Sequence, residues 1–313
     1  MKISHLLLIV ALTVSTTCAN QKSPSVKSTG DTLSRQEAVS DSSCTHPLLY
    51  EITLKGKKAY LFGSVHFGSP DFYPLASVID SVFILSKNLV VEINSEAPDF
   101  AKKSQALFSK GMLKGDKTLK DVLSKKGYAE VVKALEGYNL TIEQFSKFEP
   151  WLLALTLESI DMQASGLQNE YGIDLHFMAK AQKSNKEILQ IETVEKQVAL
   201  LQELNSESFL LYSIKDRQKN REIVGKLMQA FRCGREDQLE KLVFEDFSDE
   251  IANYNKLFKK LVTDRNYTMA DYVTSYLDKN SGPAFVVVGA GHVIGSEGIV
   301  EILRKRGAEV KKL

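Results

Sequence analysis

Two short segments of this chain share the pattern Gly-x-x-His, and each of them follows an apolar run. Gly63-Ser64-Val65-His66 comes after Ala59-Tyr60-Leu61-Phe62, and Gly289-Ala290-Gly291-His292 comes after Ala284-Phe285-Val286-Val287-Val288. Short apolar runs that end at glycine are typical of buried β-strands. Glycine also allows a sharp turn and a close approach of the backbone. Each pattern therefore predicts a strand whose carboxyl end is followed by a histidine.

The periodicity around the first pattern predicts an α/β unit. Residues 49–54 alternate, Lys55-Gly56-Lys57 indicates a turn, and the apolar run 59–62 follows, so we expect a hairpin. Residues 74–87 have apolar positions at helical spacing, and 89–93 form a β-branched run. The order strand, helix, strand predicts one parallel, right-handed βαβ unit.

The rest of the chain repeats this alternation. We expect further elements in this order: a helix at 174–185, a strand at 187–192, a strand at 284–288, a glycine-rich turn at 289–295, a helix at 298–306 and a final edge strand at 309–313. Residues 99–170 and 200–280 are rich in good helix formers and predict inserted helical regions. The sequence thus predicts one α/β domain over residues 46–313. Its central sheet is mixed and mostly parallel, it carries an extensive inserted helical region, and its site lies at the carboxyl ends of the strands.

The first 45 residues are predicted to lie outside that domain. A short basic head precedes the apolar run 6–14, which is too short to span a bilayer and is typical of a signal peptide. We expect a signal peptide at 1–19, a disordered linker at 20–45, and an exported bacterial protein in the periplasm. Cys18 leaves a second possibility open, an outer-membrane lipoprotein tethered to the membrane through that lipidated cysteine.

Charge and cysteine content exclude several classes. The chain has 40 Lys+Arg, 39 Asp+Glu and 43% hydrophobic residues, so we expect a folded globular protein and no nucleic-acid partner. Beyond Cys18 only Cys44 and Cys233 remain, too few for a zinc site made of thiolates. In an oxidising compartment these two would either pair or stay as unlinked buried thiols, and the sequence leaves both open.

Polar residues end four of the predicted strands. They are His66 and His292, with Glu92 after Leu89-Val90-Val91 and Glu192 after Ile188-Leu189-Gln190-Ile191. The carboxyl ends of parallel strands meet at one edge of a sheet, where ligands bind. Imidazoles and carboxylates suit zinc, manganese, cobalt or iron. One such residue alone is usually structural, but four from one predicted face indicate a metal or acid–base site.

A competing motif fails. Gly289-Ala290-Gly291 resembles the start of a dinucleotide fingerprint, but the third glycine, Gly295, comes one residue late and only one helix follows. The sequence contains no phosphate-binding loop, no zincin motif and no serine-hydrolase elbow.

The sequence resembles the TraB/GumN family, whose animal members are the Tiki proteases. The resemblance covers roughly residues 47–313 and rests on separate pieces in a fixed order: Tyr60 to His66, Val91-Glu92, Tyr171-Gly172-Ile173-Asp174, Ile191-Glu192-Thr193 with Gln197, Asp264-Arg265-Asn266, and Val288 to Gly295. The family usually has Thr in place of Ser64 and often Leu in place of Gln190. The resemblance implies an α/β core related to the erythromycin-esterase and haem-binding ChaN-like proteins.

The same resemblance implies divalent-metal-dependent peptide hydrolysis. Carried over to this chain, it makes His66, Glu92 and His292 the candidate ligands of a divalent metal (Mn, Co or Zn). Four further family positions would complete the catalytic pocket: Asp174, Glu192, Arg265 and Asn266. The backbone at Gly63, Ser64, Gly289 and Gly291 would lie close to the bound group.

We therefore expect an exported divalent-metal-dependent hydrolase of the peptidase class, acting on a peptide or protein. Glu92 either completes the metal ligands or takes the proton of a water molecule. Arg265 either stabilises an oxyanion or orients a carboxylate. Two alternatives remain. The crevice binds haem, iron or a peptide without turnover, or the helical middle recognises a partner and the crevice is vestigial.

Overall fold

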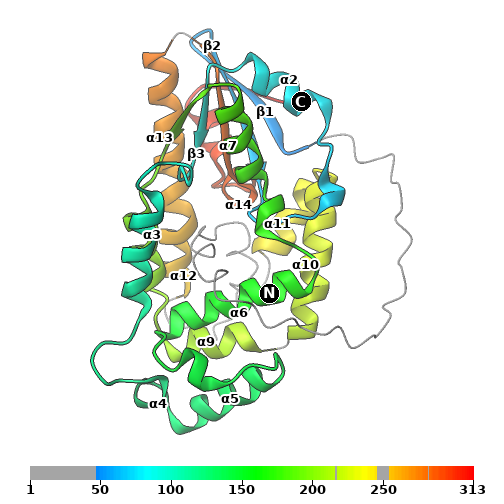
Figure 1. Ribbon diagram of the computed structural model, residues 1–313. Helices are drawn as coiled ribbons and strands as arrows, with labels where there is room; N and C mark the ends of the chain where they lie inside the picture. The colour runs from blue at the N-terminus through cyan, green and yellow to red at the C-terminus, as the bar shows by residue number, and fades with distance from the viewer. Residues whose placement is uncertain (1–46, 216, 245–253, 281) are drawn as a thin grey trace.

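A single six-stranded sheet organises the chain (Figure 1). The computed structural model describes residues 47–215, 217–244, 254–280 and 282–313, so the expected signal peptide, the linker to residue 45, Cys18 and Cys44 lie outside the described residues. The strands are β1 (Leu49–Leu54), β2 (Lys57–Ser64), β3 (Asn88–Val91), β4 (Glu187–Gln190), β5 (Ala284–Gly289) and β6 (Glu309–Lys312). Their order across the sheet is β4-β3-β5-β2-β1-β6.

The sheet is mixed and mostly parallel, as the sequence predicts. β2, β5, β3 and β4 run parallel to one another, β1 forms the expected antiparallel hairpin with β2, and β6 pairs antiparallel with β1 at the edge. The two strands of the predicted βαβ unit, β2 and β3, are parallel but not neighbours. β5, from the end of the chain, lies between them and pairs with both. The second Gly-x-x-His segment is thereby placed beside the first.

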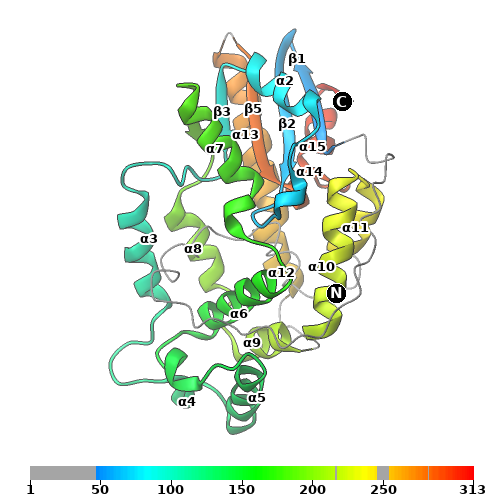
Figure 2. The same ribbon diagram turned by 45° about the vertical axis from the view of Figure 1, so that its right-hand side comes forward.

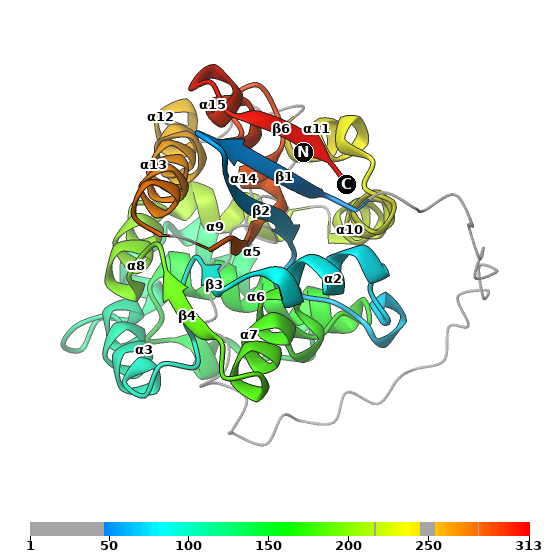
Figure 3. The ribbon, with the colours of Figure 1, turned by 90° about the horizontal axis from the view of Figure 1, so that it is seen from above.

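Helices cover both faces of the sheet (Figure 3). α2 (Ser77–Leu85) and α7 (Ile173–Lys183) lie on one face, and α13 (Asp264–Lys279) and α15 (Ile299–Lys305) on the other. Aromatic rings attach the first pair of helices: Phe177 of α7 packs against Phe62 of β2 and Phe285 of β5, with ring centroids 6.0 and 4.8 Å away. Phe83 of α2 contacts Phe177 at 5.3 Å. This cluster fixes α7, and with it Asp174 in its first turn.

The remaining helices gather beyond the carboxyl ends of the parallel strands (Figures 1 and 2). They are α3 (Phe100–Phe108), α4 (Leu119–Val122), α5 (Lys125–Glu136), α6 (Pro150–Ala164), α8 (Val194–Gln202), α9 (Glu207–Ile214), α10 (Arg217–Arg232), α11 (Glu236–Phe244) and α12 (Tyr254–Phe258). Trp151 of α6 is buried, with 1% of its surface exposed. The expected capping pair is present as well, since Thr141 N donates to Gln144 Oε1 at 2.9 Å, at the start of a 3-10 helix, Ile142–Phe145.

The predicted glycine-rich turn contains a one-turn helix, α14 (Ala290–Val293), so His292 is presented from helical backbone. Cys233 is disulfide-bonded, and Cys44, whose pairing with it the sequence leaves open, lies outside the described residues. Within the described part of the chain, none of the helices combines the length and the apolar character needed to cross a bilayer.

Candidate functional site

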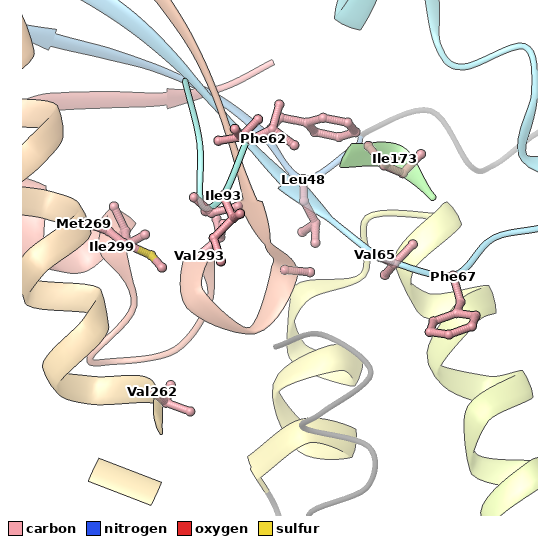
Figure 4. Packing of buried hydrophobic residues seen from close by; sticks show 14 of the residues in the cluster. Leu48, Phe62, Val65, Phe67, Ile93, Ile173, Val262, Met269, Val293 and Ile299 are labelled. Carbon is pink, nitrogen blue, oxygen red and sulfur yellow. The ribbon is translucent and has the colours of Figure 1, made fainter. Parts of the chain in front are cut away.

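The four polar residues predicted at strand ends lie at one edge of the sheet. β2 and β5 are paired so that Ser64 stands opposite Gly289, which brings the following His66 and His292 to the same region. Glu92 follows β3, and Glu192 follows β4. The pairing of these two strands continues beyond their ends through the backbone N–H groups of Ile191 and Glu192. Buried apolar residues adjoin the site residues along the chain and fix their backbone (Figure 4): Val65, Ile93, Ile173 and Val293.

A backbone clamp brings Asp174 to His66. The chain just after β2 pairs with the chain just before α7, since Ile173 N donates to Val65 O at 3.0 Å and Gly68 exchanges two hydrogen bonds with Gln168. The two strands of this clamp are so close that a Cβ at Gly172 would lie 2.5 Å from the carbonyl oxygen of His66. The Asp174 carboxylate then reaches both Ser64 and His66. Ser64 Oγ donates to Asp174 Oδ1 at 2.9 Å, and His66 Nδ1 lies 3.0 Å from Asp174 Oδ2.

A π-helical turn delivers Arg265 and Asn266. Residues Lys259–Thr263 form a π-helix directly before α13, and Asp264 N donates to Lys259 O. Such wide turns alter which side chains face a neighbour and leave a carbonyl without its usual partner. Here the Nη1 group of Arg265 donates to Leu261 O at 3.2 Å. Consecutive residues of α13 can therefore both reach the site, where they are 3% and 2% exposed.

Asn266 holds the imidazole of His292. The two are joined by a 2.6 Å contact between Asn266 Oδ1 and His292 Nδ1, while Asn266 Nδ2 donates to Glu297 O at 2.7 Å. Because the amide nitrogen is committed to a carbonyl, the amide oxygen faces the imidazole and Nδ1 carries the proton. The other nitrogen of His292, Nε2, is left unprotonated. This is the tautomer that a metal-binding histidine needs.

Arg265 lies between the two strand-end glutamates. Its Nε donates to Glu192 Oε1 and Oε2 at 3.0 and 3.1 Å, and its Nη2 lies 2.9 Å from Glu192 Oε2 and donates to Glu92 Oε2. Gln197 of α8 adds a donor to both carboxylates, at 3.0 Å from Glu192 and 3.3 Å from Glu92. The remaining oxygen of Glu92 accepts from Gly289 N at 2.7 Å. The two carboxylates and the guanidinium thus form one buried, hydrogen-bonded ion cluster.

Burial and neighbouring charges set the protonation of the His66–Asp174 pair. Burial alone would lower the pKa of His66, but the Asp174 carboxylate, with a contribution from Glu92, outweighs burial and raises that pKa above its usual value. Burial would likewise raise the pKa of Asp174. The charge of His66 and the hydrogen bond from Ser64 instead hold it below its usual value. The pair therefore favours an ionised carboxylate beside a readily protonated imidazole.

The other three ionisable groups behave differently. Burial lowers the pKa of His292 well below its usual value, and the positive charges of Arg265 and His66 add to that effect. Burial raises the pKa of Glu92, although Arg265 opposes it. The pKa of Glu192 is lowered, because the two-point contact with Arg265 outweighs its burial. The site therefore holds one imidazole that is easily protonated, that of His66, and one that is kept neutral, that of His292.

The donor atoms of this site fit a divalent cation in chemical type. Two buried nitrogens of the site, Nε2 of His66 and Nε2 of His292, have no hydrogen-bond partner among the described residues, while Nδ1 of His66 and Oδ2 of Asp174 face only each other, 3.0 Å apart as an ion pair. Imidazole nitrogens oriented from behind by a carboxylate or an amide are typical metal ligands. Within the described part of the chain, however, no three His, Cys, Asp or Glu side chains form a group placed to hold a metal ion. Glu92 in particular has both of its oxygens engaged.

The residues predicted to lie close to a bound group have structural contacts of their own. Gly63 lies tightly between Leu48 and Ala290, both 3.2 Å from the place of a Cβ. Ser64 bonds Asp174, Gly289 bonds Glu92, and Gly291 is buried in α14. These contacts hold the neighbouring strand ends together.

Gln197 contacts both glutamates and belongs to the site, which the strand-end pattern of the sequence does not predict. Its sequence signal is local. Thr193 caps the N-terminus of α8 directly after β4, and Gln197, four residues later, lies one turn further along the helix. A polar residue at that spacing from the N-cap is expected on the face that covers the strand end.

A known protein family matches most of this chain. The family model described as the TraB/PrgY/gumN family matches residues 48–312, nearly all of the described chain. The chain belongs to this family. The TraB/PrgY/gumN match contains every candidate site residue, from Gly63 to His292.

The relatives found by sequence comparison are distant. The uncharacterized protein YbaP of Escherichia coli is 24% identical over 259 residues, which cover 81% of this chain and 91% of that protein. An uncharacterized protein of Treponema pallidum is 24% identical over 274 residues, covering 83% and 80%. Metalloprotease TIKI2 of Xenopus tropicalis is 24% identical over 311 residues, covering 81% of this chain and 57% of that protein. No solved structure matches.

Proposed function

We propose that this TraB/PrgY/gumN protein is a divalent-metal-dependent hydrolase of the peptidase class. One observation carries the proposal: His66 and His292, from neighbouring parallel strands, each turn Nδ1 toward a polar partner and leave Nε2 without one among the described residues. Two buried imidazoles oriented in this way suit a bound cation. The distant similarity to a protein named as a metalloprotease points to the same class.

His66 and His292 would hold the cation through Nε2, and a carboxylate would complete the set. When bound, such an ion lowers the pKa of a water molecule toward neutrality and polarises a carbonyl oxygen. The chain's own contribution is orientation, since Asp174 lies behind His66 and Asn266 holds His292.

Glu92 is the carboxylate with two possible roles. Its Oε2 accepts from Arg265 and Gln197, whereas its Oε1 accepts from Gly289 N, so Oε1 is the oxygen that could join the ligands while the contact with Arg265 is kept. Burial raises its pKa, which suits the alternative role of taking a proton from water. Arg265 directs Nε and Nη2 at the two glutamates and Nη1 at Leu261 O, so its contacts favour orienting carboxylates over binding an oxyanion.

Metal content tests the proposal most directly. We expect the full-length protein to retain zinc, manganese or cobalt after dialysis, and His66→Ala and His292→Ala each to lose most of it by elemental analysis. His176→Ala is the matched control: this histidine stacks on Tyr73, at 4.8 Å between ring centroids, and is expected to leave metal content unchanged. Unchanged metal in both site variants would refute the shared site.

A second experiment separates hydrolysis from binding. Cleavage of a peptide library that is lost on chelation and restored by added metal supports the hydrolase. A Soret band on haem addition, with no cleavage under any metal, would instead support a binding protein. Glu92→Gln distinguishes the two roles of that residue, because retained metal without cleavage indicates proton transfer and lost metal indicates a ligand.

We also propose that this activity lies outside the cytoplasm. The support is the apolar run 6–14 in the sequence, which falls outside the described residues. Mass spectrometry of the protein expressed from its full reading frame tests the location. Removal of residues 1–19 fits a soluble exported protein, removal of 1–17 with added lipid at Cys18 fits a lipoprotein, and an intact N-terminus opposes both.

A further inference from the structure

The end of the molecule opposite the sheet carries a local excess of positive charge. Residues 110–126, the lysine-rich tip, contain six lysines, two aspartates and no arginine, in a chain whose net charge is only +1. The six lysines are all exposed: Lys110, Lys114, Lys117, Lys120, Lys125 and Lys126. Figures 1 and 2 show α4 and the start of α5, which bear the last three, at the end of the molecule farthest from the sheet. The overall charge of the chain is nearly balanced, but its positive charge is distributed unevenly and is concentrated at this end.

Two carboxylates at the tip, Asp121 and Glu207, accept hydrogen bonds from backbone and hydroxyl groups, while Asp116 is exposed. Asp121 Oδ2 accepts from Thr118 N and Oγ1, both at 2.8 Å, and so caps α4. Glu207, from α9, accepts from Ser124 N at 2.7 Å and from Ser124 Oγ at 2.5 Å. Among the described residues, the one ion pair that involves a lysine of the tip is the weak 3.8 Å contact of Lys126 with Glu130. The other five lysines form no ion pair among the described residues, although the charges of Lys120 and Lys117 help to lower the pKa of Asp121.

The backbone of the tip is firmly held, so the lysines keep a defined arrangement. Lys147 donates to the carbonyls of Gly115 and Lys117, at 2.8 and 3.0 Å, and Leu119 N donates to Ser146 O at 2.8 Å. Leu119 and Leu123 are buried beneath α4. Val122, between them, is 37% exposed and stands among the lysines. The tip is thus a firmly held cationic surface that also exposes the apolar side chain of Val122.

This chemistry matches a flat anionic surface better than a single bound anion. Lysine ammonium groups are point charges without the fork that arginine uses to bind one phosphate or carboxylate. Spread over one end of the molecule, they would interact with many headgroups together, and an exposed valine would add apolar contact at the headgroup boundary. We infer that the lysine-rich tip is a docking surface for membranes that contain anionic phospholipids. The partner would be the headgroup layer, and the opposite end of the molecule would face away from it.

Vesicle binding by the full-length chain tests this inference. The wild type is compared with a tip variant (Lys114→Gln, Lys117→Gln, Lys120→Gln, Lys125→Gln) and a control variant (Lys87→Gln, Lys183→Gln, Lys279→Gln, Lys311→Gln). The control removes the same charge from exposed lysines around the sheet, and the N-terminal segment is the same in all three proteins. Cosedimentation is measured with phosphatidylglycerol vesicles and with phosphatidylcholine vesicles, at low and at high salt.

We expect binding to phosphatidylglycerol that weakens with salt, because exposed charges are screened. Each lysine facing such a surface contributes roughly fivefold in affinity. The tip variant should therefore bind at least about 100-fold more weakly than wild type, while the control variant loses much less. Equal losses in the two variants would overturn the inference, and so would binding that ignores lipid charge. Stronger binding of the tip to single-stranded DNA or to polyglutamate than to vesicles would overturn it as well.

Discussion

The Nδ1 atom of His292 lies 2.6 Å from Oδ1 of Asn266, and this contact decides which nitrogen of the imidazole is free. The amide cannot reverse its ends, since its Nδ2 donates to Glu297 O at 2.7 Å. His292 is therefore held in one tautomer by a neutral partner, whereas His66 lies beside a carboxylate. The surroundings of the two histidines therefore favour different charge states of the imidazole, protonated at His66 and neutral at His292.

This contact predicts that Asn266→Ala weakens metal binding without removing a proposed ligand. Loss of the group behind a metal-bound histidine lowers affinity about 10–100-fold, because the imidazole is free to rotate and to change tautomer. Titration calorimetry with zinc or manganese on the full-length protein measures the change. Asn280→Ala, at the other end of α13, is the control and should leave affinity unaltered. An affinity equal to that of wild type in Asn266→Ala would show that the amide has no such role.

The ion cluster around Arg265 predicts a large and pH-dependent loss of stability. Arg265→Met leaves Glu92 and Glu192 buried without their cation, and removing one partner of a buried ion pair lowers the free energy of unfolding by about 3–5 kcal/mol. The pKa of Glu92, already raised in the wild type, then rises further, and the pKa of Glu192 changes from below to above its unfolded value. The folded variant consequently binds more protons than the unfolded chain, and its stability increases as the pH falls.

Urea unfolding of wild type and Arg265→Met at pH 7 and pH 5 measures this loss. We expect the difference between the two proteins to be smaller at pH 5. Adding Glu192→Gln to the variant should recover part of the loss at pH 7. A difference below about 1 kcal/mol, or one that grows on acidification, would argue against a tightly coupled buried cluster.

The clamp between His66 and Asp174 predicts that Gly172→Ala is strongly destabilising. A Cβ at this position would meet the carbonyl of His66 at 2.5 Å, and two paired backbone segments have little room to separate. We expect a loss of roughly 2 kcal/mol or more in the free energy of unfolding. Gly225→Ala is the matched control, since Gly225 lies in α10 with nothing within 4 Å, and alanine there should stabilise the helix by about 0.5–1 kcal/mol. Similar effects in both variants would contradict the close approach.

Tyr276 predicts a decline in stability at alkaline pH. Burial, with a contribution from Glu187, raises its pKa to about 12, and its hydroxyl donates to Asn88 Oδ1 at 2.7 Å. An unfolded tyrosine loses its proton near pH 10, so between the two values the unfolded chain binds fewer protons and stability falls as the pH rises. One such group contributes at most about 1.4 kcal/mol per pH unit. The urea midpoint of the wild type should fall faster between pH 9 and pH 11 than that of Tyr276→Phe. If the midpoints of the two proteins fall at the same rate, Tyr276 is not a cause of the decline.

The strands and their functional ends could be predicted from the sequence because both depend on local pattern. Apolar runs mark β2, β3 and β5, and once these strands are parallel, Glu92 and His292 must lie at the same edge as His66. The mixed, mostly parallel sheet is confirmed by the structure. The metal-binding and catalytic roles assigned to the site residues stay predictions.

Long-range pairings could not be predicted in the same way. No local periodicity indicates that β5 lies between β2 and β3, since this order depends on which edges fit together in three dimensions. The approach of Asp174 to His66 depends on backbone pairing between segments far apart in the chain, and the presentation of Arg265 and Asn266 depends on a single π-turn. The amino-acid types at these positions give little indication of such features, although the features determine which polar atoms come into contact.

The position of β5 between β2 and β3 has a consequence for biosynthesis. The strand that joins the two halves of the sheet is the last but one to be made, and it carries the second histidine. Until it has been synthesised, β2 and β3 cannot be joined and each keeps an unpaired edge, which is a ready template for pairing with other chains. A nascent or truncated chain therefore lacks both a complete sheet and a complete site. The two candidate histidines therefore come together only when synthesis is nearly finished, and chains that end before residue 284 are expected to aggregate or be degraded.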